Sequence, residues 1–182
     1  IDKWDGATVP AYFLDIQGSS GGSPYNVSSS ISTTSSGQSS TWFHRDSLTI
    51  GNWHQVSITY DGLNYISYLD GEVMHHNTTS GGILNGDGNI IIGNMFNGLM
   101  DNIQIWNTSL SQQEIQNYMN CPPTGSESGL VGFWNFETGS GTTTYDQTSN
   151  GNNGTINGAT YDTNVPPQSC GLTNANGCDS TA

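Results

Sequence analysis

Residues 51–110 constrain the fold more than any other part of the chain. Short runs in this segment alternate apolar and polar side chains, and each run ends at a glycine turn. The run over 53–60 ends at Asp61-Gly62, and the run over 65–69 ends at Asp70-Gly71. This alternation, with a turn about every ten residues, predicts antiparallel strands joined by hairpins.

The same signals extend through the first two thirds of the sequence and predict an all-β antiparallel sandwich. The expected strands are 1–4, 11–16, 26–33, 41–45, 53–60, 65–69, 72–77, 90–93 and 98–106. Segment 18–40 is rich in Ser, Thr and Gly, so its composition fits disorder, with the strand at 26–33 as the alternative. The chain opens within a strand, so we expect an upstream segment in the full-length protein.

One short helix is expected at 111–119. Ser109 or Ser111 is suited to cap its start, and Glu114 lies three residues after Ser111, as in a capping box. An apolar stripe follows at Ile115, Tyr118 and Met119, and two prolines at 122–123 end the helix.

Three blocks carry a resemblance to a known family. They are Gly51–Gly62, the turn Tyr68–Glu72, and Gly98–Asn107 with its Gly-Leu-Met-Asp start. In this order they resemble the laminin-G-like, concanavalin A-like β-sandwich family. The resemblance implies a jelly-roll fold and a non-catalytic role in binding or adhesion. The family's opening strand and long central strand, normally found before Ile1, are missing.

Three segments are expected along the chain: a sandwich at 1–120, a second segment at 121–169, and a linker or tail at 170–182. Within the second segment, Leu130–Phe136 resembles the first strand of another such domain. The chain is then either a slice of a tandem array, or Leu130–Phe136 pairs with the strand at 98–106 and completes the same sandwich. We favour the second arrangement, because a long unpaired edge strand invites aggregation.

Charge argues against a nucleic-acid partner, and the lengths of the apolar segments argue against membrane insertion. Two basic residues oppose 15 acidic ones, for a net charge of −13. Since nucleic-acid binding depends on Lys and Arg, a nucleic-acid partner is not expected. No segment approaches the roughly 20 apolar residues that span a bilayer, so membrane insertion is not expected either. An acidic surface suits a secreted protein and divalent cations.

The sequence also argues against catalysis. Glycosidases on this fold place two Glu on one strand, because the acid and the nucleophile must flank one bond. The four Glu, at positions 72, 114, 127 and 137, share no expected strand. No Gly-x-Ser-x-Gly elbow is present. We therefore predict that the chain is not an enzyme.

Calcium is the expected cofactor. The loop 146–154 offers the carboxylate of Asp146 and the amides of Asn150 and Asn152 among glycines, and Ca²⁺ prefers such oxygen ligands. It resembles the family's Asp-x-Ser-Gly-Asn-x-Asn-x-Gly loop, with Thr-Ser at 148–149 in place of Ser-Gly. Asp101, in the Gly-x-x-Asp block, is the further metal candidate. The alternative is an Asx-turn loop held by its own side chains.

Glycan binding requires an aromatic platform beside polar groups, since sugar faces are apolar and their rims carry hydroxyls. Trp42, His44 and Arg45 form the cluster where an aromatic residue meets the arginine, and Phe96 is a further candidate. For Trp42 the alternative is a structural role.

Three cysteines, Cys121, Cys170 and Cys178, are too few for a disulfide scaffold. We prefer a Cys121–Cys170 bridge, with a Cys170–Cys178 loop as the rival. Either bridge indicates an oxidising compartment. The tail from Cys170 resembles the start of a repetitive module in secreted proteins of gliding, polymer-degrading bacteria.

Together these observations predict a lectin-like binding or adhesion module of a secreted or cell-surface bacterial protein, stabilised by calcium. The expected partner is a polysaccharide or glycan. The alternative function is a structural spacer, or a repeat that binds neighbouring repeats in an adhesin array, with no glycan ligand.

Overall fold

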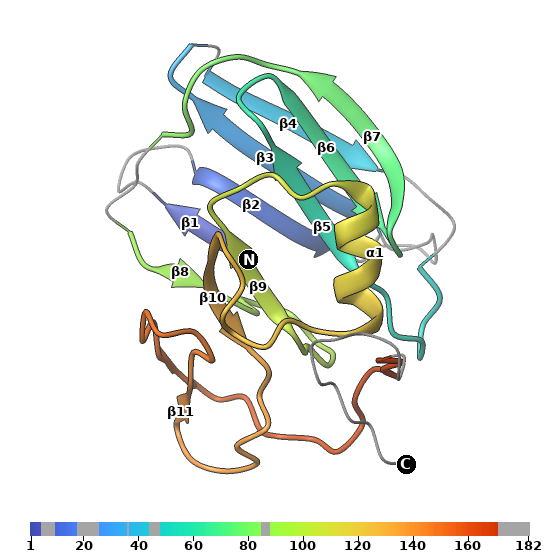
Figure 1. Ribbon diagram of the computed structural model, residues 1–182, viewed down its shortest axis with the longest axis vertical. Helices are drawn as coiled ribbons and strands as arrows, with labels where there is room; N and C mark the ends of the chain where they lie inside the picture. Colours follow the sequence, from blue (N-terminus) through green and yellow to red (C-terminus); the bar gives the residue numbers. More distant parts are fainter. Residues whose placement is uncertain (5–9, 18–25, 36, 44–47, 85–87, 171–182) are drawn as a thin grey trace. The chain divides into compact units, whose positions relative to one another are not determined.

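The computed structural model describes residues 1–4, 10–17, 26–35, 37–43, 48–84 and 88–170, and Figure 1 shows their elements. The chain separates into two compact units, Ile1–Asn97 and Gly98–Ala182. The elements of the first unit are β1 (Asp2–Trp4), β2 (Pro10–Gln17), β3 (Asn26–Thr33), β4 (Gly37–Phe43), β5 (Val56–Tyr60), β6 (Asn64–Leu69), β7 (Glu72–Thr78) and β8 (Ile90–Ile91). Those of the second are β9 (Ile103–Trp106), α1 (Gln112–Asn120), β10 (Leu130–Trp134), β11 (Thr143–Thr144) and β12 (Gly154–Thr155).

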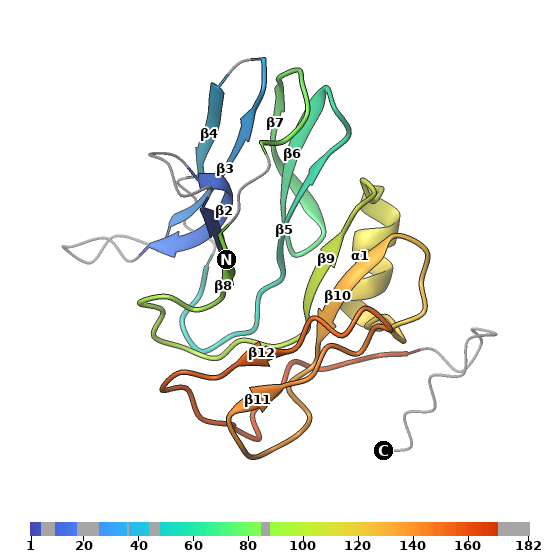
Figure 2. The ribbon, with the colours of Figure 1, turned by 90° about the vertical axis from the view of Figure 1, so that its left-hand side faces the viewer.

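The first unit is a sandwich of two antiparallel sheets. Their strand orders are β4-β3-β2-β1-β8 and β5-β6-β7, and Figure 2 shows them as two facing layers. The layers meet at Ser29 of β3: the Tyr65 hydroxyl donates to its Oγ at 2.6 Å, and the Ser67 Oγ lies 3.2 Å away. The predicted all-β antiparallel sandwich with one short helix is confirmed.

Strand β3 corrects the disorder interpretation for residues 26–33 and supports the alternative of a strand there; residues 18–25 lie outside the described residues. It pairs with β2 over six residues and with β4 over seven. Its serines 28, 29, 30 and 32 are fully buried. Serine has little intrinsic preference for strands, but the two flanking strands supply the hydrogen bonds and exclude water. Local composition therefore did not predict that β3 is a buried strand.

Removing the hydroxyl of Tyr65 tests this sandwich interface. We expect Tyr65→Phe to lower the free energy of unfolding by about 1–2 kcal/mol, because a buried hydrogen bond to Ser29 is lost. Tyr145→Phe is the matched control, since Tyr145 is 51% exposed. Urea denaturation of both variants measures the difference. Equal effects would show that the Tyr65 hydroxyl does not contribute to the interface.

Two predicted strands start later than the sequence suggests. Strand β5 begins at Val56 rather than at residue 53, because the amide of Gln55 donates to the Asp70 carboxylate. Strand β9 begins at Ile103 rather than at residue 98, directly after Asn102 with φ at 53°. A left-handed residue interrupts the extended backbone, so the ladder starts after it.

The second unit is built around the β9–β10 pair. The strands are antiparallel, with Trp106 opposite Leu130 and Ile103 opposite Trp134. This is the pairing that the sequence favours for Leu130–Phe136. The buried apolar side chains of this unit include Ile115, Leu130, Phe133 and Trp134. The compact units divide at 97/98, so β9 and α1 belong to the second unit. That the two segments complete one sandwich stays a prediction.

Helix α1 confirms the predicted helix and its cap. Ser111 accepts a hydrogen bond from the Glu114 amide, and the Glu114 carboxylate accepts one from the Ser111 amide. At the other end, the Tyr118 ring packs on Trp106 with ring centroids 5.0 Å apart. The cap therefore fixes where the helix begins, and the aromatic contact holds it against β9.

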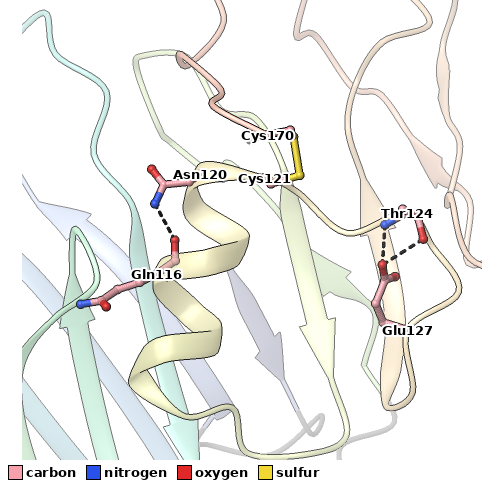
Figure 3. Close-up of a disulfide and its surroundings, with 6 residues drawn as sticks. All are labelled: Gln116, Asn120, Cys121, Thr124, Glu127 and Cys170. Carbon is pink, nitrogen blue, oxygen red and sulfur yellow. Dashed lines mark hydrogen bonds between the residues drawn. A yellow bond between two sulfur atoms is a disulfide. The ribbon is translucent and has the colours of Figure 1, made fainter. Parts of the chain in front are cut away.

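A disulfide joins Cys121, the residue after α1, to Cys170, with a Cα–Cα distance of 4.7 Å (Figure 3). This confirms the preferred pairing over the Cys170–Cys178 rival; Cys178 lies outside the described residues. Nearby, the Glu127 carboxylate accepts hydrogen bonds from the amide and hydroxyl of Thr124. The bridge ties both ends of the 121–170 segment together next to α1.

Candidate functional site

The loop after β11 is organised by the carboxylate of Asp146. Its Oδ1 accepts hydrogen bonds from the amides of Phe133 and Thr148, at 3.0 and 2.9 Å. Its Oδ2 accepts from the Asn152 amide and the Thr148 hydroxyl, both at 2.9 Å. A largely buried carboxylate with four donors is a structural centre for the loop.

These contacts also control the protonation of Asp146. Desolvation by burial raises its pKa, but the hydrogen bonds from the amides of Phe133, Thr148 and Asn152 and from the Thr148 hydroxyl outweigh that effect. The pKa of Asp146 is therefore lowered below its ordinary value, and the carboxylate is ionised at neutral pH.

The two predicted amide ligands of this loop hold it to strand β10. The side-chain nitrogens of Asn150 and Asn152 donate to the backbone oxygen of Val131, at 3.0 and 2.9 Å. The Trp134 indole donates to the Asn152 backbone oxygen at 2.9 Å. The structure thus brings Asp146, Asn150 and Asn152 together in one loop, held by its own side chains. Calcium binding by these residues stays a prediction.

Asp101 lies in a different environment. Its Oδ1 accepts from the Asn102 amide at 2.8 Å, whereas its Oδ2 is buried with no hydrogen-bond partner in the described part of the chain. Burial raises the pKa of Asp101, the Asn102 amide opposes this rise, and the charge of Glu137 adds to it. Among the described residues, no three His, Cys, Asp or Glu side chains form a metal-binding group.

The predicted glycan-binding residues divide between the two edges of the larger sheet. Trp42 lies in edge strand β4, in register with Ser28 of β3, which in turn is in register with Asp15 of β2. Phe96 follows β8, the opposite edge strand, and is half-buried in a turn where its amide donates to the Gly93 oxygen. The structure therefore does not place Phe96 beside β4. His44 and Arg45 lie outside the described residues.

The structure contains one polar cluster that is not apparent from the sequence. Residues 49, 54 and 70 come together at the Asp70-Gly71 turn: the His54 Nδ1 lies 2.9 Å from the Asp70 Oδ2, and its Nε2 lies 3.3 Å from the Thr49 Oγ1. The Asp-Gly turn was visible in the sequence, but the 16-residue separation of His54 from Asp70 hid the pairing.

The described part of the chain contains no helix with the length and hydrophobicity that crossing a membrane requires.

Comparison with known proteins identifies a family. The family model described as the concanavalin A-like lectin/glucanases superfamily matches residues 4–116. Among solved structures, the chain is similar to an S-layer domain-containing protein from Clostridium thermocellum, at 20% sequence identity and a TM-score of 0.35. The match covers 58% of this chain and spans 59% of that one. No curated protein matches the chain.

Proposed function

This chain belongs to the concanavalin A-like lectin/glucanases superfamily, and on that premise we propose that it is a carbohydrate-binding domain that does not cleave its glycan. The domain is proposed to act in adhesion or polysaccharide targeting. Its disulfide supports a secreted or cell-surface location, since such bonds persist in oxidising compartments.

The position of Trp42 carries the proposal. Among the described strands, β4 is at the edge of the five-stranded sheet, so one side of its backbone has no partner strand in this part of the chain. The register aligns Trp42 with the half-buried carboxyl residue Asp15, one strand beyond Ser28. An aromatic residue and a hydrogen-bond acceptor in one row suit a sugar, which has an apolar face and a hydroxyl rim.

The environments of two of the four glutamates support a non-hydrolytic role. Glu114 is committed to the cap of α1, and Glu127 accepts hydrogen bonds from the Thr124 and Gly125 amides. The pKa of Glu114 is lowered by the amide and hydroxyl of Ser111. For Glu127, burial raises the pKa but the Thr124 and Gly125 contacts lower it overall. A general acid needs a raised pKa, so neither carboxyl group is suited to protonating a glycosidic oxygen.

Replacement of Trp42 tests the proposed glycan site. We expect Trp42→Ala to weaken binding to a neutral polysaccharide about tenfold, the loss of roughly 1–1.5 kcal/mol of aromatic contact. Affinity electrophoresis in gels containing the polysaccharide measures the change. Tyr145→Ala, at an exposed aromatic residue of the second unit, serves as the control.

The outcomes separate the two candidate functions. Weaker binding with an unchanged unfolding midpoint supports the carbohydrate-binding domain. Binding equal to that of the wild type contradicts a site at Trp42. An effect of Trp42→Ala on folding alone favours the structural spacer.

We also propose that calcium stabilises the second unit through Asp101, with Glu137 as the nearby carboxylate. A buried carboxylate oxygen without a donor is costly, and a divalent cation supplies the missing charge. The carboxylate of Asp146 is a poorer ligand, because a cation there displaces donors from both oxygens. Asn150 and Asn152 donate their side-chain nitrogens to the Val131 oxygen, contacts that do not engage their side-chain oxygens.

Thermal unfolding in EDTA and then in excess calcium tests this site. Calcium is expected to raise the unfolding midpoint of the wild type, since a ligand that binds only the native state stabilises it. Because the pKa of Asp101 is raised, its stability contribution is present at low pH and lost as pH rises. Asp101→Asn should therefore raise the midpoint in EDTA at neutral pH and abolish the calcium response.

Asp162→Asn, at an exposed turn, is the control and should keep the calcium response. A wild-type midpoint that calcium leaves unchanged contradicts the metal site.

A further inference from the structure

The cluster at Thr49, His54 and Asp70 has the geometry of an activated hydroxyl. The Thr49 backbone amide donates to the His54 Nε2 at 3.2 Å, so this nitrogen carries a lone pair. The opposite nitrogen, Nδ1, then carries the proton and donates to the Asp70 Oδ2 at 2.9 Å. The histidine is held in the tautomer that a general base for a hydroxyl requires.

Asp70 is itself fixed in place. Its Oδ1 accepts from the Gln55 amide at 2.9 Å, and its backbone amide donates to the Gln55 oxygen at 2.8 Å. Its φ of 51° places it in the left-handed region at the start of the Asp70-Gly71 turn. A carboxylate fixed in this way orients the imidazole, which makes Asp70 a positioning residue.

The hydroxyl of Thr49 also has a donor beside it. The side-chain nitrogen of Asn52 donates to the Thr49 Oγ1 at 2.6 Å. With its oxygen accepting from Asn52, the hydroxyl can direct its own proton to the His54 Nε2, 3.3 Å away, in place of the Thr49 amide, which donates to the same lone pair. Thr49 and Asn52 are both exposed, so a reagent from solvent reaches the hydroxyl.

We propose that Thr49 is an acyl-accepting nucleophile that takes an acyl group from an activated carboxylic ester. In the step, the Thr49 Oγ1 forms a bond to the ester carbonyl carbon while its proton moves to the His54 Nε2. The bond from that carbon to the alcohol or phenol oxygen then breaks. The leaving oxygen takes the proton from His54, and the product is an ester of Thr49.

The surroundings define the acyl group. The neighbouring side chain of Ile50 is 83% exposed and can offer apolar contact to a methyl group. A small acyl group such as acetyl therefore suits the site. The reaction is a stoichiometric modification of the protein and does not depend on glycan binding.

Acylation by p-nitrophenyl acetate tests the proposal. The wild type should release about one equivalent of p-nitrophenolate and carry one acetyl group on Thr49, located by peptide mass spectrometry. Thr49→Val removes the hydroxyl but keeps the backbone contact to His54, and it should abolish the label. His54→Gln should slow labelling about 100-fold or more, the usual contribution of a general base.

His76→Gln is the matched control, because His76 is exposed and contacts Asn64 instead of the cluster; it should react like the wild type.

Asp70→Asn should lower the maximal acylation rate without changing the ester concentration at half-maximal rate. General destabilisation of the protein would not separate these two quantities. A wild type that reacts no faster than Thr49→Val overturns the proposal. A label found on His54, on Lys3 or on the N-terminus also overturns it.

Discussion

Replacing Asp146 with alanine lowers the free energy of unfolding by about 3–5 kcal/mol, one of the two largest effects that we expect in this protein. The change removes a carboxylate that accepts the amides of Phe133, Thr148 and Asn152. The amides of Phe133 and Thr148 are buried donors that lose their partner, so the loop is held less firmly to β10. Urea denaturation measures the loss, and amide exchange over 130–136 shows whether β10 is the part that opens.

The control is Asp162→Ala, at a surface turn where the Oδ1 accepts only the Asn164 amide among the described contacts. It should change stability by less than about 0.5 kcal/mol. Equal losses in the two variants would contradict a central role for Asp146.

The pH dependence follows from the same contacts. The pKa of Asp146 is lowered in the folded state, so its contribution is present above the ordinary carboxyl pKa of about 4 and is lost as pH falls below it. The wild type should therefore lose more stability than Asp146→Ala when pH falls from neutral into this range.

Removing the Cys121–Cys170 disulfide, by replacing both cysteines with alanine, lowers stability by about 4 kcal/mol. The two residues are 49 positions apart, and opening a loop of that length increases the entropy of the unfolded chain. The bridge also holds the Ser169 amide against the Asn120 oxygen at 2.8 Å, a contact that the variant loosens. Denaturation with and without a reducing agent measures the effect.

Cys178→Ala is the control for this double variant and should leave stability unchanged, because Cys178 is not part of the bridge. If a reducing agent shifted the denaturation curve of the double variant as much as that of the wild type, the bridge would not be the source of the effect.

Features fixed by local chemistry were predictable from the sequence. Ser111 and Glu114 fixed the start of the helix, because a capping box involves only neighbouring residues. Alternation and the Asp-Gly turns located β6 and β7 closely, because their side chains follow the pleat. The family could also be identified from the sequence, because each block that resembles it is continuous in the chain.

Features fixed by tertiary contacts were not predictable. Ser28 and Ser30 lie in a segment whose composition fits disorder, yet both are fully buried in β3. The hydrogen bonds that Asp146 accepts from Phe133 and Asn152 come from backbone amides, which carry no signal in the sequence. The contact of His54 with Asp70 depends on a hairpin that brings two turns together.

The central claim, that this domain binds a glycan, is tested most directly by depletion of the whole chain from solution by insoluble neutral polysaccharides. Neutral polymers are required because the chain carries a net charge of −13 and would adhere to any cationic matrix. Our account predicts saturable depletion by at least one polysaccharide, little affected by salt and reversed by the matching oligosaccharide. Depletion by none of them, with the chain shown to be folded, would contradict the claim and favour the spacer.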